Sequence, residues 1–348
     1  MSITFEHLVA DAVAAGASDL HLTVGHAPAV RVNGSIQPLA CAALGEETIS
    51  SALMAILSPE QVQTWQRTRR LCFTWCHREH GYLRVNIYSH MGRMEAAVRI
   101  SRGDLPDLPE LGVPETMAEL MRQPQGLVLI TGATGQGKTT TLHALIRRVN
   151  VEQRKKIITI EDPVEFRHRE GRSVVVQQEL GIDTDTFHGA VVHALRQDPD
   201  ILCIGEMRDL DTISAALTAA ETGHLVVATL HTTGAAGTIS RIVDVFPPHQ
   251  QEQVRLQLAI TLQGVISQRL LPRADGSGRL LVYELMISND AVRAHIRSNK
   301  LHQIASVIQT HAPMGMRAMD RMIRDAYHTG EITYETAASV ASDPKILK

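Results

Sequence analysis

The residues with the clearest chemical role form one glycine-rich loop that ends in a lysine and two threonines. In order, the loop reads Gly132, Ala133, Thr134, Gly135, Gln136, Gly137, Lys138, Thr139 and Thr140. This spacing is typical of a phosphate-binding loop, in which the glycines let successive backbone N–H groups converge on phosphates. Lys138 can reach the terminal phosphates, and the Thr139 hydroxyl can ligate a magnesium ion. The loop therefore predicts binding of a nucleoside triphosphate with Mg²⁺.

The segments beside this loop support that interpretation. An apolar run, residues 126–131, precedes the loop, and a helical stretch, residues 139–149, follows it. A strand before and a helix after are the context that separates a true phosphate-binding loop from a chance match to the pattern. We therefore expect all the residues of the loop to line a nucleotide site.

An acidic box follows the apolar run 156–160. It consists of Glu161, Asp162 and Glu165 around Pro163. Carboxylates at the end of a strand can hold magnesium or polarise a water molecule. A solvated acidic turn is the alternative, but the position one β-unit after the loop favours a functional site. We expect metal-ligand roles for all these carboxylates, together with Thr139, and catalytic roles for Glu161 and Glu165.

A further carboxylate, Glu206, stands at the end of another apolar run, residues 200–204. The run ends in Gly205 and Glu206, where an ordinary Walker B strand ends in Asp-Glu. We expect Glu206 to polarise the attacking water, while the acidic box supplies the missing metal-binding carboxylate. The alternative is that Glu206 caps the helix that follows.

Two histidines, His224 and His231, flank the apolar run 225–230. Their odd separation points the side chains to opposite faces of a regular strand, so the two should not share a metal ion. His231 can hydrogen-bond a γ-phosphate or a neighbouring carboxylate and so sense hydrolysis. His224 can be purely structural.

These groups need a sheet that brings the strand ends together. The apolar runs 126–131, 156–160, 200–204 and 225–230 alternate with helical segments, which is typical of βαβ units on a parallel sheet. We therefore assign residues 115–348 to a nucleoside-triphosphatase core of the α/β class with C-terminal helices.

A second, α+β domain is expected before this core, in residues 1–102. Helical patterns cover residues 4–15 and 46–69, and extended patterns cover 18–24, 28–39 with an Asn33-Gly34 turn, 71–78, 82–90 and 93–101. Residues 103–114 hold three prolines and two glycines, so we interpret them as a linker.

The composition limits the possible partners. The chain has 348 residues and a net charge of -3, with 3% aromatic residues, so it offers no basic field to nucleic acid and we expect no such partner. No run approaches about 20 apolar residues, and the first residues lack a signal-peptide pattern, so we expect a cytoplasmic protein that meets a membrane only through partners. The four cysteines include no Cys-x-x-Cys pair, which argues against a zinc ribbon.

The phosphate-binding loop, the acidic box, the Gly-Glu-Met-Arg-Asp form of Walker B and the two-histidine segment occur in that order. Together they resemble the four motifs of the type II/IV secretion ATPases. Other segments are similar to signatures of the PilT branch of this family, the retraction ATPases of twitching motility: residues 16–22, 31–34, 267–272, 291–297 and 315–320. The resemblance covers almost the whole chain.

The resemblance implies a homohexameric ring that hydrolyses ATP with Mg²⁺. It implies a PAS-like N-terminal domain and a RecA-like P-loop ATPase core, at the cytoplasmic face of the inner membrane on a platform protein. Arg84 and Arg99 match the family's N-terminal arginine strands and would reach the nucleotide, or else are ordinary surface arginines. Gln136 replaces the family's usual serine, and we expect nucleotide binding to survive because this side chain points away in most such loops. Residues 291–297 are either a partner surface or an amphipathic packing helix.

We therefore expect a motor that powers type IV pilus retraction. One alternative is an ATPase of pilus assembly, or of a type II, type IVB or conjugation system. A RecA-like nucleic-acid motor is disfavoured by the net charge. The alternative from another class is a nucleotide-gated scaffold without turnover, against which Lys138, Glu206 and His231 argue.

Overall fold

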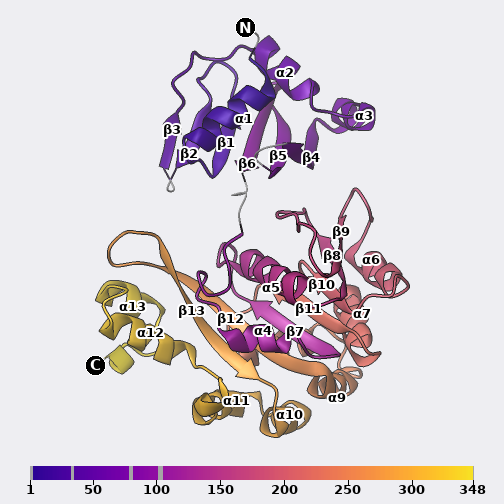
Figure 1. Ribbon diagram of the computed structural model, residues 1–348, viewed down its shortest axis with the longest axis vertical. Coiled ribbons are helices and arrows are strands. Elements are labelled where there is room, and N and C mark those ends of the chain that lie inside the picture. Colours follow the sequence, from indigo (N-terminus) through magenta and orange to yellow (C-terminus); the bar gives the residue numbers. More distant parts are fainter. Residues whose placement is uncertain (1–2, 33–34, 78–80, 101–104, 348) are drawn as a thin grey trace. The chain divides into compact units, whose positions relative to one another are not determined.

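The computed structural model describes residues 3–32, 35–77, 81–100 and 105–347, which divide into two compact units. The N-terminal unit comprises Met1–Leu105 and Pro163–Arg167, and the C-terminal unit comprises Pro106–Asp162 and His168–Lys348 (Figure 1). The chain thus divides inside the segment that we interpret as a linker. The segment Pro163–Arg167, which we had assigned to the core, groups with the N-terminal unit.

The N-terminal unit is built on a six-stranded antiparallel sheet of order β3-β2-β1-β6-β5-β4. Its strands are β1 (Asp19–Leu22), β2 (Ala29–Val32), β3 (Ser35–Pro38), β4 (Arg70–His77), β5 (Gly81–His90) and β6 (Arg93–Ile100). Alternate residues of β5, namely Leu83, Val85 and Ile87, are buried, as expected of a sheet with one face in the core. The Asn33-Gly34 turn lies outside the described residues, although the strands on either side of it pair.

Helices α1 (Phe5–Ala14), α2 (Glu46–Met54) and α3 (Pro59–Thr68) complete this unit. The prediction of one helix over residues 46–69 was wrong, because Ser58 and Pro59 start a new helix. The Ser58 side chain accepts from the Gln61 backbone, the Gln61 side chain accepts from the Ser58 backbone, and Pro59 occupies the first turn. A capping box and a proline in the first turn mark the beginning of a helix.

The C-terminal unit is built on a seven-stranded sheet of order β13-β12-β7-β11-β10-β8-β9. Its strands are β7 (Gly126–Thr131), β8 (Lys156–Glu161), β9 (Val174–Glu179), β10 (Ile201–Ile204), β11 (Leu225–Leu230), β12 (Leu262–Pro272) and β13 (Arg279–Ile287). All neighbours pair in parallel except β12 and β13, which pair antiparallel. The predicted parallel strands of the core are therefore confirmed, and β9, β12 and β13 are additions to them.

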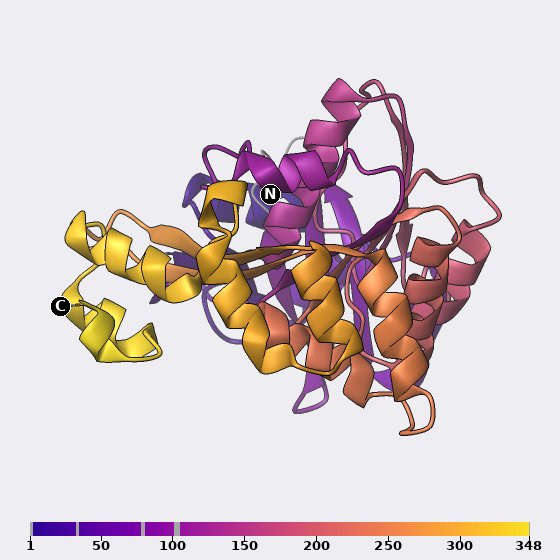
Figure 2. The same cartoon turned by 90° about the horizontal axis from the view of Figure 1, so that it is seen from below.

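Helices cover both faces of this sheet. They are α4 (Glu115–Leu120), α5 (Lys138–Glu152), α6 (Phe187–Ala194), α7 (Leu210–Glu221), α8 (Ala235–Asp244), α9 (Gln251–Thr261), α10 (Asp290–Arg297), α11 (Ile304–Thr310), α12 (Met319–His328) and α13 (Tyr334–Val340). Figure 2 shows α4 and α5 on one face and the row of helices α9 to α11 along the other. Because both faces are covered, the whole of β7 is buried.

Helix α10 is the segment for which we considered a partner surface or a packing role. Its Val292 and Ile296 are fully buried in the core, which supports packing by one side of the helix. Arg297 is exposed, so contact of this side of α10 with a partner stays a prediction. Among the described residues, no helix combines the length and the apolar character needed to cross a membrane.

Candidate nucleotide-binding and catalytic site

The phosphate-binding loop and three of the predicted catalytic side chains lie at one edge of the C-terminal sheet. The phosphate-binding loop leaves β7, His231 follows β11, Glu206 follows β10 and Glu161 ends β8. These strands are parallel neighbours in the order β7-β11-β10-β8, so their carboxyl ends meet at the same edge. That edge is where open parallel sheets bind their ligands.

The backbone of the loop has a shape that requires glycine. Gly132, Gly135 and Gly137 have φ values of 145°, 78° and 81°, which side-chain-bearing residues rarely adopt. A Cβ on Gly132 would also lie 2.6 Å from the carbonyl oxygen of Gln268. Helix α5 begins at Lys138, and no side chain caps its first turn, so the backbone N–H groups there are oriented to receive an anion.

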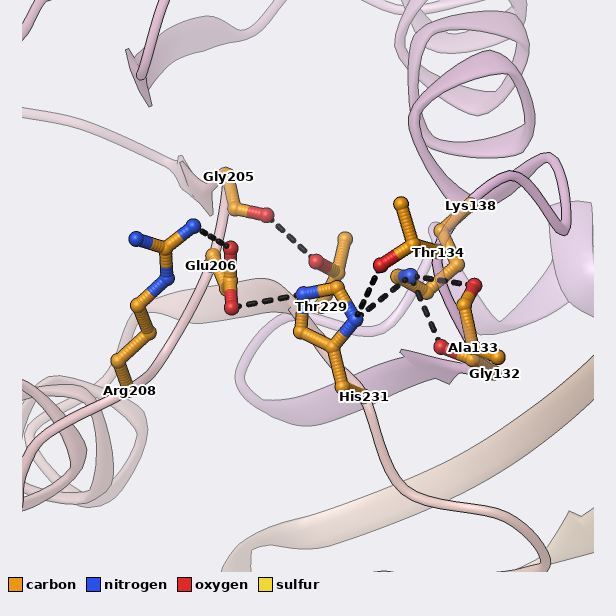
Figure 3. Close-up of polar contacts among 9 residues, drawn as sticks. All are labelled: Gly132, Ala133, Thr134, Lys138, Gly205, Glu206, Arg208, Thr229 and His231. Atoms are coloured by element: carbon orange, nitrogen blue, oxygen red, sulfur yellow. Dashed lines mark hydrogen bonds and ion pairs between the residues drawn. The ribbon is translucent and has the colours of Figure 1, made fainter.

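Lys138 lies folded over the loop that carries it. Its Nζ donates to the carbonyl oxygens of Gly132 at 2.8 Å and Ala133 at 3.0 Å (Figure 3). Burial lowers the pKa of Lys138, and the nearby Glu206 charge opposes this shift. The ammonium group therefore lies at the mouth of the loop, where phosphate oxygens could replace the two carbonyls.

His231 links the loop to Glu206. Its Nε2 lies 2.8 Å from Glu206 Oε1, and its Nδ1 lies 3.4 Å from both Lys138 Nζ and Thr134 Oγ1 (Figure 3). An ammonium group only donates, so His231 Nδ1 accepts and the proton on Nε2 points to the carboxylate. His231 thus connects Lys138, which is predicted to bind the phosphates, with Glu206, which is predicted to polarise the attacking water.

Glu206 is held as a carboxylate. Arg208 Nη2 donates to its Oε2 at 2.7 Å. Burial favours the neutral acid, but the bond from Arg208, the nearby His231, and the charges of Arg208 and Lys138 outweigh this effect, so the pKa of Glu206 is lowered. Glu206 is therefore ionised at neutral pH and can accept a proton.

The alternative role of Glu206 as a helix cap is wrong. Helix α7 is capped by Asp209, whose carboxylate accepts from the Thr212 backbone N–H at 2.8 Å and from the Thr212 hydroxyl at 2.9 Å. Glu206 takes no part in this cap. Its carboxylate is directed instead at Arg208 and His231.

The structure explains why glycine precedes Glu206. Gly205 N–H donates to the Ile160 carbonyl at 2.8 Å, and the Thr229 hydroxyl donates to the Gly205 carbonyl at 2.5 Å. A Cβ on Gly205 would lie 3.0 Å from that Ile160 oxygen and 3.4 Å from the Glu161 Cα. The aspartate of an ordinary Walker B strand would therefore crowd the end of β8.

We expect Gly205→Ala to lower the free energy of unfolding by about 1–3 kcal/mol, because the added methyl group overpacks the contact between β10 and β8. Gly237→Ala is the matched control. Gly237 lies in α8 with nothing within 4 Å of a built Cβ, so alanine there should be neutral or stabilising. Urea unfolding of both variants measures the difference, and equal stabilities would contradict the steric argument.

The acidic box is not one cluster. Glu161 is buried and Asp162 is exposed, while Glu165 belongs to the segment that groups with the N-terminal unit. The Glu161 carboxylate accepts from Thr159 Oγ1 at 2.6 Å and Gln177 Nε2 at 3.0 Å, and it lies 3.0 Å from His143 Nε2. In this arrangement Glu161 holds protein groups, and the catalytic and metal-ligand roles of the box stay predictions.

Magnesium fits the residues of the loop. Within the described part of the chain, no group of three or more His, Cys, Asp or Glu side chains could hold a metal ion. Mg²⁺ does not need such a group, since it keeps several waters and takes one or two protein oxygens plus phosphates. Thr139, partly exposed on the first turn of α5, can supply one of these oxygens, whereas the metal-ligand role of Asp162 stays a prediction. Bound there, the ion would neutralise charge on the phosphates.

The predicted arginines Arg84 and Arg99 lie opposite each other on β5 and β6 of the N-terminal unit. Arg99 Nε donates to Asp19 Oδ1 at 3.3 Å, and Arg84 Nε contacts Cys72 Sγ at 3.4 Å. Both side chains thus have partners within their own unit. Their role at the nucleotide stays a prediction.

Sequence reasoning missed the contacts that attach the loop to β12 and β13. The Gln136 side chain accepts from the Leu270 backbone N–H, and Arg279 Nη1 donates to the Gly135 carbonyl at 3.1 Å. Arg208 was also assigned no role, although its place two residues after Glu206 in the Walker B motif was a usable signal. Nothing local in the sequence indicates the partner of Gln136.

Comparisons with known proteins identify the family of the chain. The model of the family described as "Type II/IV secretion system protein" matches residues 99–337. The "Twitching motility protein" of Neisseria gonorrhoeae is 43% identical over 92% of this chain and 86% of its own. The "Type IV pilus retractation ATPase PilT" of Pseudomonas aeruginosa is 40% identical over 99% of both chains.

A solved structure described as the pilus retraction motor PilT with bound ADP also matches. It is 43% identical, with a TM-score of 0.93 over 99% of this chain and 98% of that one. The predicted resemblance and the predicted fold class, an α/β protein with a RecA-like P-loop ATPase core, are thereby confirmed. The chain belongs to the type II/IV secretion system protein family and is one of its ATPases.

Proposed function

We propose that this protein is a homohexameric motor whose ATP hydrolysis powers type IV pilus retraction. The observation that carries the proposal is the likeness, over nearly the full length of both chains, to relatives named for retraction and twitching motility. The loop, His231 and Glu206 supply the chemistry that such a motor needs. We further propose that it works at the cytoplasmic face of the inner membrane, against a platform protein, with Mg²⁺ on the nucleotide.

The arrangement of side chains suggests how hydrolysis proceeds. The oxygen of a water molecule forms a bond to the γ-phosphorus, the bond from that phosphorus to the bridging oxygen of ADP breaks, and a water proton passes to Glu206. Lys138 exchanges the Gly132 and Ala133 carbonyls for phosphate oxygens. His231 contacts both Lys138 and Glu206, so a change at the phosphates can alter the position of the carboxylate.

Deletion of the gene tests the direction of work. We expect cells to carry as many pili as before or more, and to lose twitching motility, because pili would still be assembled but not withdrawn. Electron microscopy of surface pili and a motility assay on agar measure the two effects. The wild-type gene supplied in trans is the control.

Other results of these experiments would contradict the proposed retraction motor. Loss of surface pili would identify an assembly motor. Unchanged pili and motility with failed conjugation or effector export would identify a secretion ATPase. A predominantly monomeric protein in light scattering with ATP and Mg²⁺ would contradict the ring.

A further inference from the structure

A buried group of polar side chains lies in the C-terminal unit beside the proposed catalytic groups. We call it the His143 cluster, and its members are His143, Thr159, Glu161, His168 and Gln177. His143 is 1% exposed and Glu161 is 4% exposed. His143 Nε2 lies 3.0 Å from Glu161 Oε2, and His143 Nδ1 lies 2.9 Å from His168 Nε2.

The two nitrogens of His143 therefore have different partners. The Glu161 carboxylate can only accept a proton, so at this ion-pair distance His143 Nε2 is the nitrogen that carries a proton. Burial raises the pKa of Glu161, but the His143 charge and the hydrogen bonds from His143, Thr159 and Gln177 outweigh it, so the pKa is lowered. Burial, together with the His143 charge, lowers the pKa of His168 to about 4, so this ring is neutral at pH 7. His143 Nε2 thus contacts an ionised carboxylate, and His143 Nδ1 contacts a neutral imidazole.

Glu161 and His168 lie on either side of the segment Pro163–Arg167. Glu161 and Asp162 are the last residues of the C-terminal unit before Pro163–Arg167, and His168 is the first residue after that segment. Helix α5 also holds the continuation of the chain, since Asn150 Nδ2 donates to the Arg169 carbonyl at 2.9 Å and Asn150 Oδ1 accepts from the Ser173 N–H at 3.2 Å. One helix thus fixes both ends of the segment that carries Glu165.

That helix is also the one that begins in the phosphate-binding loop. His143 follows Thr139 by four residues, about one turn, so both side chains lie on the same side of α5. A displacement of the first turn of α5 would move His143 and, through it, Glu161.

We propose that His143 is a positioning residue that couples the phosphate-binding loop to the acidic box. By holding Glu161 through Nε2, it keeps Glu161 and the adjacent Asp162 in place relative to Thr139 and the bound nucleotide. The proposal deepens the proposed function, since it rests on ATP hydrolysis at this site. It accounts for a buried histidine–carboxylate contact, which by itself is a weak source of stability.

A matched pair of substitutions separates the two contacts of His143. In glutamine the amide nitrogen occupies nearly the position of the histidine Nε2, so His143→Gln can still donate to Glu161. In asparagine the amide stops near the position of Nδ1, so His143→Asn can reach only the His168 side. Both substitutions remove the ring, so both should lower the thermal stability of the protein to a similar degree.

We expect His143→Asn to lower kcat for ATP by about 10- to 100-fold, because small misplacement of catalytic groups has effects of this size. Its KM for Mg-ATP should change by less than about threefold, since the loop itself is intact. His143→Gln should retain most of the wild-type kcat. Steady-state phosphate release at several ATP concentrations, and melting temperatures of both variants, are the measurements.

Equal kcat values for the two variants, whether normal or reduced in step with melting temperature, would overturn the positioning role. The failure of the proposed function looks different, because it would appear as absence of turnover in the wild-type protein. If wild type hydrolyses ATP and both variants match it, the ATPase assignment stands and His143 is structural.

Discussion

Lys138→Ala should abolish measurable ATP binding, and with it turnover. Lys138 Nζ now spans the Gly132 and Ala133 carbonyls, and alanine leaves no cation at the mouth of the loop. A hydrogen bond to a charged group contributes about 1.5–3 kcal/mol, so losing two of them weakens affinity by about 100-fold or more. Isothermal titration calorimetry with ATP and Mg²⁺ measures the loss directly.

Lys155→Ala is the matched control for this variant. Lys155 is a partly exposed lysine of the same unit, and its Nζ lies 3.0 Å from Asp200 Oδ1, so its removal changes charge without touching the loop. Binding by this variant should stay within about twofold of wild type, because an exposed ion pair contributes little. Near-normal affinity in Lys138→Ala would show that the loop does not hold the phosphates in the way proposed.

The parallel strands of the core could be predicted almost to the residue. Runs 126–131 and 225–230 coincide with β7 and β11, and run 200–204 differs from β10 by one residue. Strands buried on both faces are continuous apolar runs, and turn residues border them clearly. Strands that are buried on both faces can therefore be located from a single sequence.

The strands that were missed lack this signal. In β9 the sequence is Val-Val-Val-Gln-Gln-Glu, and Val174 is 62% exposed, because the strand lies at the edge of the sheet and buries little. Strand β12 starts at Leu262, directly after α9 ends at Thr261, with no glycine or proline between them. Neither a continuous apolar run in β9 nor a glycine or proline at the start of β12 marks these strands in the sequence.

The candidate site shows the same limit. Spacing in the sequence placed Lys138, Glu206 and His231 at strand ends, and parallel topology then brings such ends together. The contact of His143 with Glu161 joins a helix to a strand end across 18 residues, and that of Gln136 with Leu270 spans 134 residues. Such pairs depend on how elements pack, so the sequence shows which residues can act but not what holds them.

Glu206→Gln should keep nucleotide binding and lose turnover. The amide is nearly the same size as the carboxylate, so the loop and Lys138 are undisturbed, but an amide cannot accept a proton from water. Loss of a general base costs about 10²- to 10⁴-fold in kcat. Calorimetric binding of ATP together with phosphate release measures both halves of the prediction.

Glu165→Gln is the variant with which the loss of kcat in Glu206→Gln is compared. If Glu165 acts indirectly, its amide should reduce kcat much less than that of Glu206, whose carboxylate lies 2.8 Å from His231 Nε2 and 2.7 Å from Arg208 Nη2. The pKa of Glu206 is lowered, so its base form is present at neutral pH in the wild-type protein. Glutamine has no carboxyl group to ionise, so raising the pH should not restore turnover in Glu206→Gln. Equal loss in the two variants would move the base to the acidic box, and near-normal hydrolysis by Glu206→Gln would remove Glu206 from the chemistry. If the wild-type protein binds ATP but releases no phosphate, the chain is a nucleotide-gated scaffold, and the contact of His231 with Glu206 transmits binding alone.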